Sequence, residues 1–290
     1  MESQKKFTKK FSFEFFPPKT PEAVGKLQTT QEHLAKLKPD FFSVTFGAGG
    51  STRERTFETV IDIYQKTGID GVPHVSCIGS TTEEIKNVLN SYLEAGIHKV
   101  VALRGDLPSG AIGTGSLRYA SELVEFIREE TGDHFHIEVA AYPEFHPQSP
   151  SAQKDIENFK RKVDAGADAA ITQYFYNPDA YYRFMDSCEK LGIDIPIVPG
   201  VMPIINCSQL IRFSEACGAE VPRWIQKRLQ DFGDDRKAIR EFGIDVTTQL
   251  CDNLLSGGAP GIHFYTMNLF TPSETIWNNL NLGSIDRKQS

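Results

Sequence analysis

The chain has 290 residues, 40% of them hydrophobic and 24% charged, and its formal net charge is -7. This composition is that of an ordinary globular protein, and the acidic balance argues against nucleic-acid binding, which needs a basic face. The sequence contains no apolar run of about 18 residues, so it predicts no membrane span, and its charged beginning does not resemble a signal peptide. The five cysteines show no C-x-x-C spacing, which favours a reducing compartment over disulfides or a zinc site. We therefore expect a cytoplasmic protein that has no metal and binds neither nucleic acid nor membranes.

Eight short apolar segments recur along the chain, and each is predicted to be a strand. They cover residues 11–16, 41–46, 72–78, 100–103, 137–141, 169–175, 195–201 and 262–267. Helical patterns lie between most of them. The clearest is 81–96, where Thr81 and Glu84 have the spacing of a capping box and Gly96 suits a helix end. A second helical pattern covers 151–166, and a further one lies near 272–280.

Strands that alternate with helices predict parallel pairing and right-handed crossovers. Eight such units without a composition break favour a closed α/β fold, the (β/α)8 TIM barrel, as a single domain over 1–290. The seventh connection, 206–261, is the longest, and it contains a helical pattern at 234–255. We therefore expect an extra helical insertion before the eighth strand. A doubly wound open sheet is the alternative architecture.

Polar side chains follow the predicted strands at the points where they end, and the active sites of such barrels lie at those ends. The fourth strand stops at Arg104-Gly105-Asp106. A carboxylate at the tip of a buried strand costs free energy unless another group there interacts with its charge. The candidates at these ends are Glu14, Thr45, His74, Ser76, Arg104, Asp106, Tyr142, Glu144, His146, Thr172, Gln173, His263, Tyr265 and Asn268. Each of them could instead be a hydrogen-bonded structural group.

Glu14 is the hardest of these candidates to explain as a structural residue. Phenylalanines flank it on both sides, and two prolines close the segment (FEFFPP, 13–18). Apolar surroundings should raise the pKa of its carboxyl group. A raised pKa suits a proton donor, so we expect Glu14 to be a general acid.

The residue types at the strand ends exclude several chemistries. No predicted strand supplies a lysine for a Schiff base, no tight His and carboxylate set suggests a metal, and no G-x-S-x-G elbow is present. The glycine-rich loop at 47–50 lacks the G-x-G-x-x-G spacing of a Rossmann site. The basic run 160–162 is either a solvated helix face or a site that attracts a diphosphate. Two acids, aromatic rings and an amide remain, which fits a bound organic cofactor.

At these motifs the chain resembles methylenetetrahydrofolate reductase of the bacterial type. The matching segments are FEFFPP (13–18), SVTFG (43–47), PH (73–74), LRGDLP (103–108), AAYPE with HP (140–147), KRKVDAG (160–166), ITQ (171–173) and HFYT (263–266). They follow the family order from the first strand to the eighth and cover nearly the whole chain. The regulatory domain of longer eukaryotic members is expected to be absent.

The resemblance implies an FAD-containing homo-oligomer. It would reduce 5,10-methylenetetrahydrofolate to 5-methyltetrahydrofolate with NADH or NADPH by ping-pong hydride transfer, in the one-carbon metabolism that feeds methionine synthesis. Two alternatives remain at this point. One is a pterin-dependent methyltransferase on a barrel, and the other is a barrel that binds a partner without catalysis.

The resemblance also assigns roles to individual residues. Glu14 matches the general acid that protonates N10 of the folate, and Asp106 matches the carboxylate near the flavin pyrimidine ring and the folate. Gln173, Gln209, Phe213 and Thr45 match substrate-binding positions. The FAD-contact positions are Thr45, His74, Arg104, Gly105, Asp106, Tyr119, Ala120, Ala140, Tyr142, His146, Asp155, Asn158 and Lys162. One position departs from the family pattern, because Leu269 stands where an arginine commonly helps to hold the folate.

Overall fold

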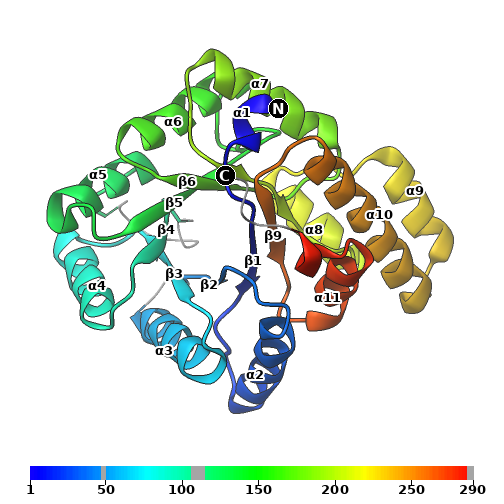
Figure 1. The fold of residues 1–290 in the computed structure, drawn as a ribbon, viewed down its shortest axis with the longest axis horizontal. Helices are drawn as coiled ribbons and strands as arrows, with labels where there is room; N and C mark the ends of the chain where they lie inside the picture. The colour runs from blue at the N-terminus through cyan, green and yellow to red at the C-terminus, as the bar shows by residue number, and fades with distance from the viewer. Residues whose placement is uncertain (47–49, 106–114, 286–290) are drawn as a thin grey trace. The chain divides into compact units, whose positions relative to one another are not determined.

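The computed structural model describes residues 1–46, 50–105 and 115–285, and of residues 50–52 it describes the backbone alone (Figure 1). Its strands are β1 (Lys10–Phe15), β2 (Phe41–Val44), β3 (Gly71–Ser76), β4 (Lys99–Leu103), β5 (His136–Ala141), β6 (Ala169–Thr172), β7 (Ile197–Val198), β8 (Gly200–Val201) and β9 (Gly261–Tyr265). Every segment predicted to be a strand overlaps at least one of them.

The strand order is β7-β6-β5-β4-β3-β2-β1-β9-β8, and β1 to β5 pair in parallel, as do β8 and β9. Pro199 alone separates β7 from β8, so the two ends of this order are consecutive in the chain. The fold is therefore a (β/α)8 barrel whose seventh strand is in two pieces. A doubly wound sheet would reverse its order at a switch point, so that alternative is wrong. The break falls at Pro199 because proline has no N–H to donate to a strand ladder.

Helices follow the strands as expected. They are α1 (Glu2–Lys5), α2 (Pro21–Ala35), α3 (Gly50–Thr67), α4 (Thr82–Glu94), α5 (Ala120–Thr131), α6 (Ala152–Asp164), α7 (Pro178–Lys190), α8 (Cys207–Cys217), α9 (Arg223–Phe232), α10 (Arg236–Ser256) and α11 (Phe270–Asn279), with a 3-10 turn at Leu282–Ser284. The capping box of α4 is confirmed, since Thr81 and Glu84 each accept the other's backbone N–H. None of the helices in the described part of the chain is long and apolar enough to cross a membrane.

The predicted insertion before the last strand is confirmed by α9. The apolar face of this short helix, Ile225 and Leu229, belongs to one buried cluster with Leu210 of α8 and Ile239 of α10. Burial of such a stripe is what stabilises a helix of this length. The same cluster includes Tyr174 after β6 and Met202 after β8, so the insertion shares a core with residues at the ends of these strands.

The chain divides into two compact units. Unit 1 contains Met1–Phe11, Ala141–Glu157 and Ile171–Ser290, and unit 2 contains Ser12–Ala140 and Asn158–Ala170. The single domain expected over 1–290 stays a prediction.

In unit 1, the buried side chain of Gln4 pairs with the backbone of the seventh strand. Its Nε2 donates to the Ile195 carbonyl at 3.1 Å, and its Oε1 accepts the Ile197 N–H at 2.9 Å. A side-chain amide carries both donor and acceptor atoms, as a peptide group does. Gln4 thus satisfies backbone groups that an adjoining strand would otherwise pair.

In unit 2, alternation along the strands sets which side chains meet the helices. Phe13 and Phe15 lie on one face of β1 and pack edge-to-face on Phe42 of β2, with ring centroids 6.0 and 5.1 Å apart. Gly71 of β3 faces α3, because a Cβ there would meet the Val60 carbonyl at 2.6 Å. The opposite face of these strands carries Glu14 and His74.

Candidate functional site

The strand-end candidates of unit 2 centre on Glu14 and His74. Oε2 of Glu14 lies 3.3 Å from Nε2 of His74, and the two side chains are 12% and 8% exposed. The pairing register explains the contact. Glu14 is level with Ser43 and Ser43 with Val72, so His74 lies two residues nearer the carboxyl end of β3. Side chains of alternate barrel strands share a layer in this way.

The flanking phenylalanines do not form the surroundings of the Glu14 carboxyl group, contrary to the expectation from the sequence. Its flanking phenylalanines face away from it, because neighbouring residues of a strand point to opposite faces. The partner of Glu14 is a titratable side chain distant in sequence. Nε2 of His74 is buried and makes no aligned hydrogen bond among the described residues, even to Glu14. A buried polar atom in this state is open to a further partner.

The turn after β4 brings the backbone close to β3. Gly105 has φ +84°, and a Cβ there would lie 1.9 Å from Oγ of Ser76, which donates to the Arg104 carbonyl at 2.9 Å. Only glycine fits this position, and β4 ends at Leu103, so the prediction that the fourth strand stops here is confirmed. Asp106 and the glycine-rich residues 47–49 lie outside the described residues.

The basic run on α6 divides into two kinds of side chain. Nζ of Lys160 lies 2.6 Å from the carboxylate of Asp164, one turn along the helix. This pair agrees with the alternative that the basic run is a solvated helix face. Nζ of Lys162 instead donates to the carbonyl of Ala140 near the end of β5. Asn158 accepts from Arg161 at 3.3 Å.

Three further candidates of unit 2 lie at the ends of other elements. The predicted residues Tyr119 and Ala120 begin α5, and the side chain of Tyr119 is exposed. Thr45 directly follows β2 and donates its N–H to the Phe15 carbonyl at 2.9 Å. Thr45 therefore extends the pairing of β1 with β2 by one residue.

Three candidates of unit 1 lie together after β5. The rings of Tyr142 and His146 are 4.7 Å apart, and the His146 N–H donates to the Asp155 carboxylate at 3.2 Å. The N–H of Gln148 donates to Nδ1 of His146 at 3.0 Å. Because Nδ1 accepts, a neutral His146 carries its proton on Nε2 and can donate it.

Gln173 directly follows β6, and a hydrogen bond fixes the orientation of its side-chain amide. Its Oε1 accepts the N–H of Tyr174 at 3.0 Å, which leaves the amide NH2 as a donor. The preceding Thr172 is fully buried, and its Oγ1 accepts the Gly200 N–H at 2.9 Å. Gln173 is therefore suited to bind an acceptor atom of a ligand.

The other unit 1 candidates lie on α8 and after β9. Gln209 and Phe213 are one turn apart on α8, and the Gln209 N–H donates to the Asn206 cap at 2.8 Å. After β9, Met267 and Asn268 have φ +54° and +58°, a conformation that is rare without glycine. The side chain of Leu269 is 44% exposed.

A cavity of about 710 Å³ adjoins the β5 candidates of unit 1, and Tyr142 and Asp155 line it. Phe145 also lines this cavity and is not among the residues predicted from the sequence. This residue has φ +103°, an outlier for a bulky side chain, and is 48% exposed. Backbone strain of this kind clusters at functional sites, but no feature of the sequence signals it.

The pKa of Glu144, which lies in the same cavity wall, gives a testable prediction about stability. Burial raises the pKa of Glu144, while a hydrogen bond from the Glu220 N–H (2.8 Å) opposes that shift. A carboxyl group with a raised pKa binds protons more tightly in the folded chain, so its contribution to stability falls as pH rises above the unfolded value of about 4.3. Glu144→Gln should therefore gain stability relative to the unmodified chain from acid to neutral pH, as measured by urea unfolding at several pH values.

The control for this experiment is Glu22→Gln on α2. A hydrogen bond from its own backbone N–H lowers the pKa of Glu22. The control difference should therefore have the opposite sign, or vanish where solvent screens this exposed group. Parallel pH curves for Glu144→Gln and the unmodified chain would contradict the assignment.

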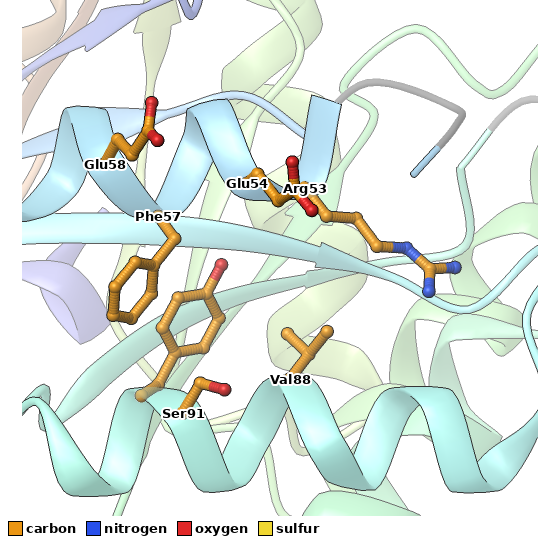
Figure 2. A pocket seen from close by; sticks show the side chains of 7 residues that line it. Arg53, Glu54, Phe57, Glu58, Val88 and Ser91 are labelled. Atoms are coloured by element: carbon orange, nitrogen blue, oxygen red, sulfur yellow. The ribbon is translucent and has the colours of Figure 1, made fainter. Parts of the chain in front are cut away.

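A second cavity, of about 330 Å³, lies between α3 and α4 in unit 2 (Figure 2). Phe57 and Val88 lie in its wall, and the guanidinium of Arg53 extends away from them to bond Ser80 (2.6 Å). None of the predicted site residues lines it. Among the described residues, no group of three or more His, Cys, Asp or Glu side chains is arranged to hold a metal ion.

The class that the fold defines is the (β/α)8 barrel, and ionisable and amide side chains lie at its strand ends, where the enzymes of this fold have their active sites. The sequence model of methylenetetrahydrofolate reductase matches residues 1–281. The chain therefore belongs to the methylenetetrahydrofolate reductase family, as its motifs predicted.

Individual relatives agree with this assignment. The chain is 40% identical over 269 residues to 5,10-methylenetetrahydrofolate reductase of Escherichia coli, covering 93% of this chain and 90% of that protein. It is 37% identical over 292 residues to methylenetetrahydrofolate reductase (NADH) 1 of Arabidopsis thaliana, of which it covers 49%. A solved structure from Clostridium thermocellum, described as binding two copies of 5-methyl-5,6,7,8-tetrahydrofolic acid, has a TM-score of 0.69 over 98% of this chain and 99% of that one, at 14% identity. That likeness supports the fold.

Proposed function

We propose that this protein reduces 5,10-methylenetetrahydrofolate to 5-methyltetrahydrofolate with electrons from NADH or NADPH that pass through FAD. The observation that supports the proposal is the contact of the Glu14 carboxyl, whose side chain is 12% exposed, with His74 at the strand ends of unit 2, in a chain of this family. A carboxyl group largely removed from solvent at a strand end is placed to act as a general acid.

The described residues fit FAD. The buried Nε2 of His74 has no aligned hydrogen bond, and Arg104 and Lys162 add positive charge. Cationic groups suit a diphosphate. The residues that would hold the cofactor are Thr45, His74, Arg104, Gly105, Tyr119, Ala120, Ala140, Tyr142, His146, Asp155, Asn158 and Lys162. When bound, FAD supplies the hydride chemistry.

The roles of the protein groups follow from their chemistry. Glu14 delivers a proton to N10 of the folate as the five-membered ring opens, and Gln173 donates its amide N–H to each substrate in turn. Gln209 and Phe213 bind substrate, and the ring of Phe213 stacks on a flat heterocycle. Asp106, assigned by resemblance, would stabilise the cationic form of the opened folate.

The experiment is anaerobic mixing of the FAD-loaded chain with each nicotinamide separately. The yellow flavin band should bleach with NADH or NADPH and return when methylenetetrahydrofolate is added. A chain that takes up no FAD, or bleached flavin that the folate does not reoxidise, would overturn the proposal. Methyl transfer from a folate without flavin would support the methyltransferase alternative instead.

We also propose a cytoplasmic homo-oligomer that acts in the one-carbon metabolism feeding methionine synthesis. The family assignment supports this setting. Complementation of a methionine-requiring strain that lacks this reductase would test the pathway, and light scattering would test the assembly. Growth that still needs methionine, or a monomer in solution, would contradict the respective proposal.

The departure at Leu269 gives a prediction about folate binding. Leu269 is exposed at the start of α11, and an arginine there could pair with a folate carboxylate. Leu269→Arg should lower the KM for methylenetetrahydrofolate roughly 3- to 10-fold, with kcat nearly unchanged, since a charge-assisted bond at an exposed site is worth about 1 kcal/mol. The control is Leu269→Gln, which adds polarity without charge. Equal KM values for the two variants would show that this position does not hold the folate.

A further inference from the structure

The contact between Glu14 and His74 couples the proposed acid to a second titratable group. The joined atoms, Oε2 and Nε2, are 3.3 Å apart, and both side chains are largely removed from solvent. At this separation a proton can pass directly between an imidazole nitrogen and a carboxyl oxygen. A general acid must also regain its proton after every turnover.

We infer that His74 is the positioning residue of Glu14, holding its carboxyl group and returning its proton, an inference that rests on the proposed acid role of Glu14. In the folate step the O–H bond of Glu14 breaks, an N–H bond forms at N10, and Glu14 is left ionised. A solvent proton then binds the imidazole of His74. It passes from Nε2 to Oε2, which restores the neutral imidazole and the carboxylic acid.

In unit 2, the side chains level with Glu14 and His74 on the flanking strands carry no charge. On the flanking strand β2, Ser43 is level with Glu14, and on β4, Val101 is level with His74. Neither of these side chains titrates near neutral pH. The helix α3 packs on the other face of β3, where Gly71 meets Val60. Its charged side chains therefore do not face His74.

The charged side chains of β4, β5 and the turn after β4 have partners of their own. Arg104 follows β4 and donates from Nε to the Gly105 carbonyl at 3.2 Å. Glu138 is level with Val101 of β4, and its carboxylate lies 3.3 Å from Nζ of Lys99 and 3.9 Å from Nε2 of His136. The ammonium group of Lys99 compensates the charge of Glu138, so the carboxyl group beside His74 is that of Glu14.

The geometry also explains why the pair is not already a tight hydrogen bond. Nε2 of His74 is near Oε2 but not aligned with it. Catalytic hydrogen bonds are often long or misaligned in the free enzyme and tighten when substrate binds.

The test is nitrogen NMR of the full chain labelled with 15N-histidine, with His74 assigned by loss of its signals in His74→Gln. In Glu14→Gln, at one fixed pH, the Nε2 resonance of His74 should move, because the carboxyl oxygen 3.3 Å from that atom has been replaced by an amide. Glu14→Asp keeps the carboxyl group but holds it farther from His74, because its side chain is one methylene shorter, so its Nε2 resonance should move in a different way from that of Glu14→Gln. The resonances of His134, whose Nε2 contacts the Ile97 carbonyl at 3.0 Å, serve as the internal control and should not move.

A second measurement links the pair to the reaction. The pH dependence of flavin reoxidation by methylenetetrahydrofolate should shift in His74→Gln at matched FAD content, whereas a purely structural loss would lower the rate equally at every pH. Identical His74 resonances in the Glu14→Gln and unmodified chains would overturn the inference. A chain that binds no FAD would defeat the proposed function instead, and the NMR spectra would still report whether the two side chains are in contact.

Discussion

Glu14→Gln is expected to abolish reduction of the folate while leaving reduction of the flavin by the nicotinamide within a few-fold of normal. The carboxamide has nearly the shape of the carboxyl group but cannot release a proton. Opening of the folate ring needs a proton at N10, and hydride transfer from the nicotinamide does not. Because general acid catalysis is worth about 10²–10⁴-fold, the folate half-reaction should slow by that factor.

Stopped-flow absorbance separates the two half-reactions. Each is started anaerobically with FAD-loaded enzyme, and FAD content is matched between variants. The control is Glu22→Gln, a change of the same chemistry on the exposed first turn of α2. It should leave both rates unchanged. Equal losses in both half-reactions would mean that Glu14 organises the site without donating a proton.

Gly261→Ala is expected to give the largest loss of stability among simple substitutions in unit 1. This first residue of β9 has φ +134°, and a Cβ there would lie 1.7 Å from the carbonyl oxygen of Lys10 at the start of β1. Both strands would have to move. Backbone strain and overpacking each cost about 1–3 kcal/mol, so the variant should lose roughly 3 kcal/mol or more, or fail to fold.

Two control variants separate the contributions to that loss. Gly68 has φ +71° but open space where the methyl group of an alanine would lie, so Gly68→Ala should cost only the strain, about 1–2 kcal/mol. Gly25 lies inside α2 with open space and no positive φ, so Gly25→Ala should stabilise by about 0.5–1 kcal/mol. Urea unfolding of the three variants measures the series. A Gly261→Ala loss no larger than that of Gly68→Ala would show that the strands yield easily at this point.

Much of the fold follows from sequence patterns because its elements are local. The capping box of α4 and the apolar runs of the strands depend on residues a few positions apart. The break at Pro199 also follows from the chemistry of proline, although the pattern predicted one continuous strand over 195–201. The number of helices in the long seventh connection does not follow from the sequence pattern, because it depends on packing within the cluster to which α9 contributes.

The candidate site was less predictable, since its contacts join distant residues. Glu14 was singled out for its phenylalanine neighbours, yet its partner is His74, which the pairing register of β1, β2 and β3 brings near. The positive φ of Phe145 arises from the path of the loop, which no residue type in the sequence requires. The roles of Asp106 and the FAD-contact residues stay predictions.

The pairing of Gln4 with the seventh strand has a practical consequence for handling the protein. Proteolytic removal of the first few residues, or a tag fused directly to them, would break the two hydrogen bonds between Gln4 and the backbone at Ile195 and Ile197. The strand would then expose unpaired amide groups and invite contact with other chains, as an open sheet edge does. Aggregation of shortened preparations would thus arise far along the chain from the cut itself.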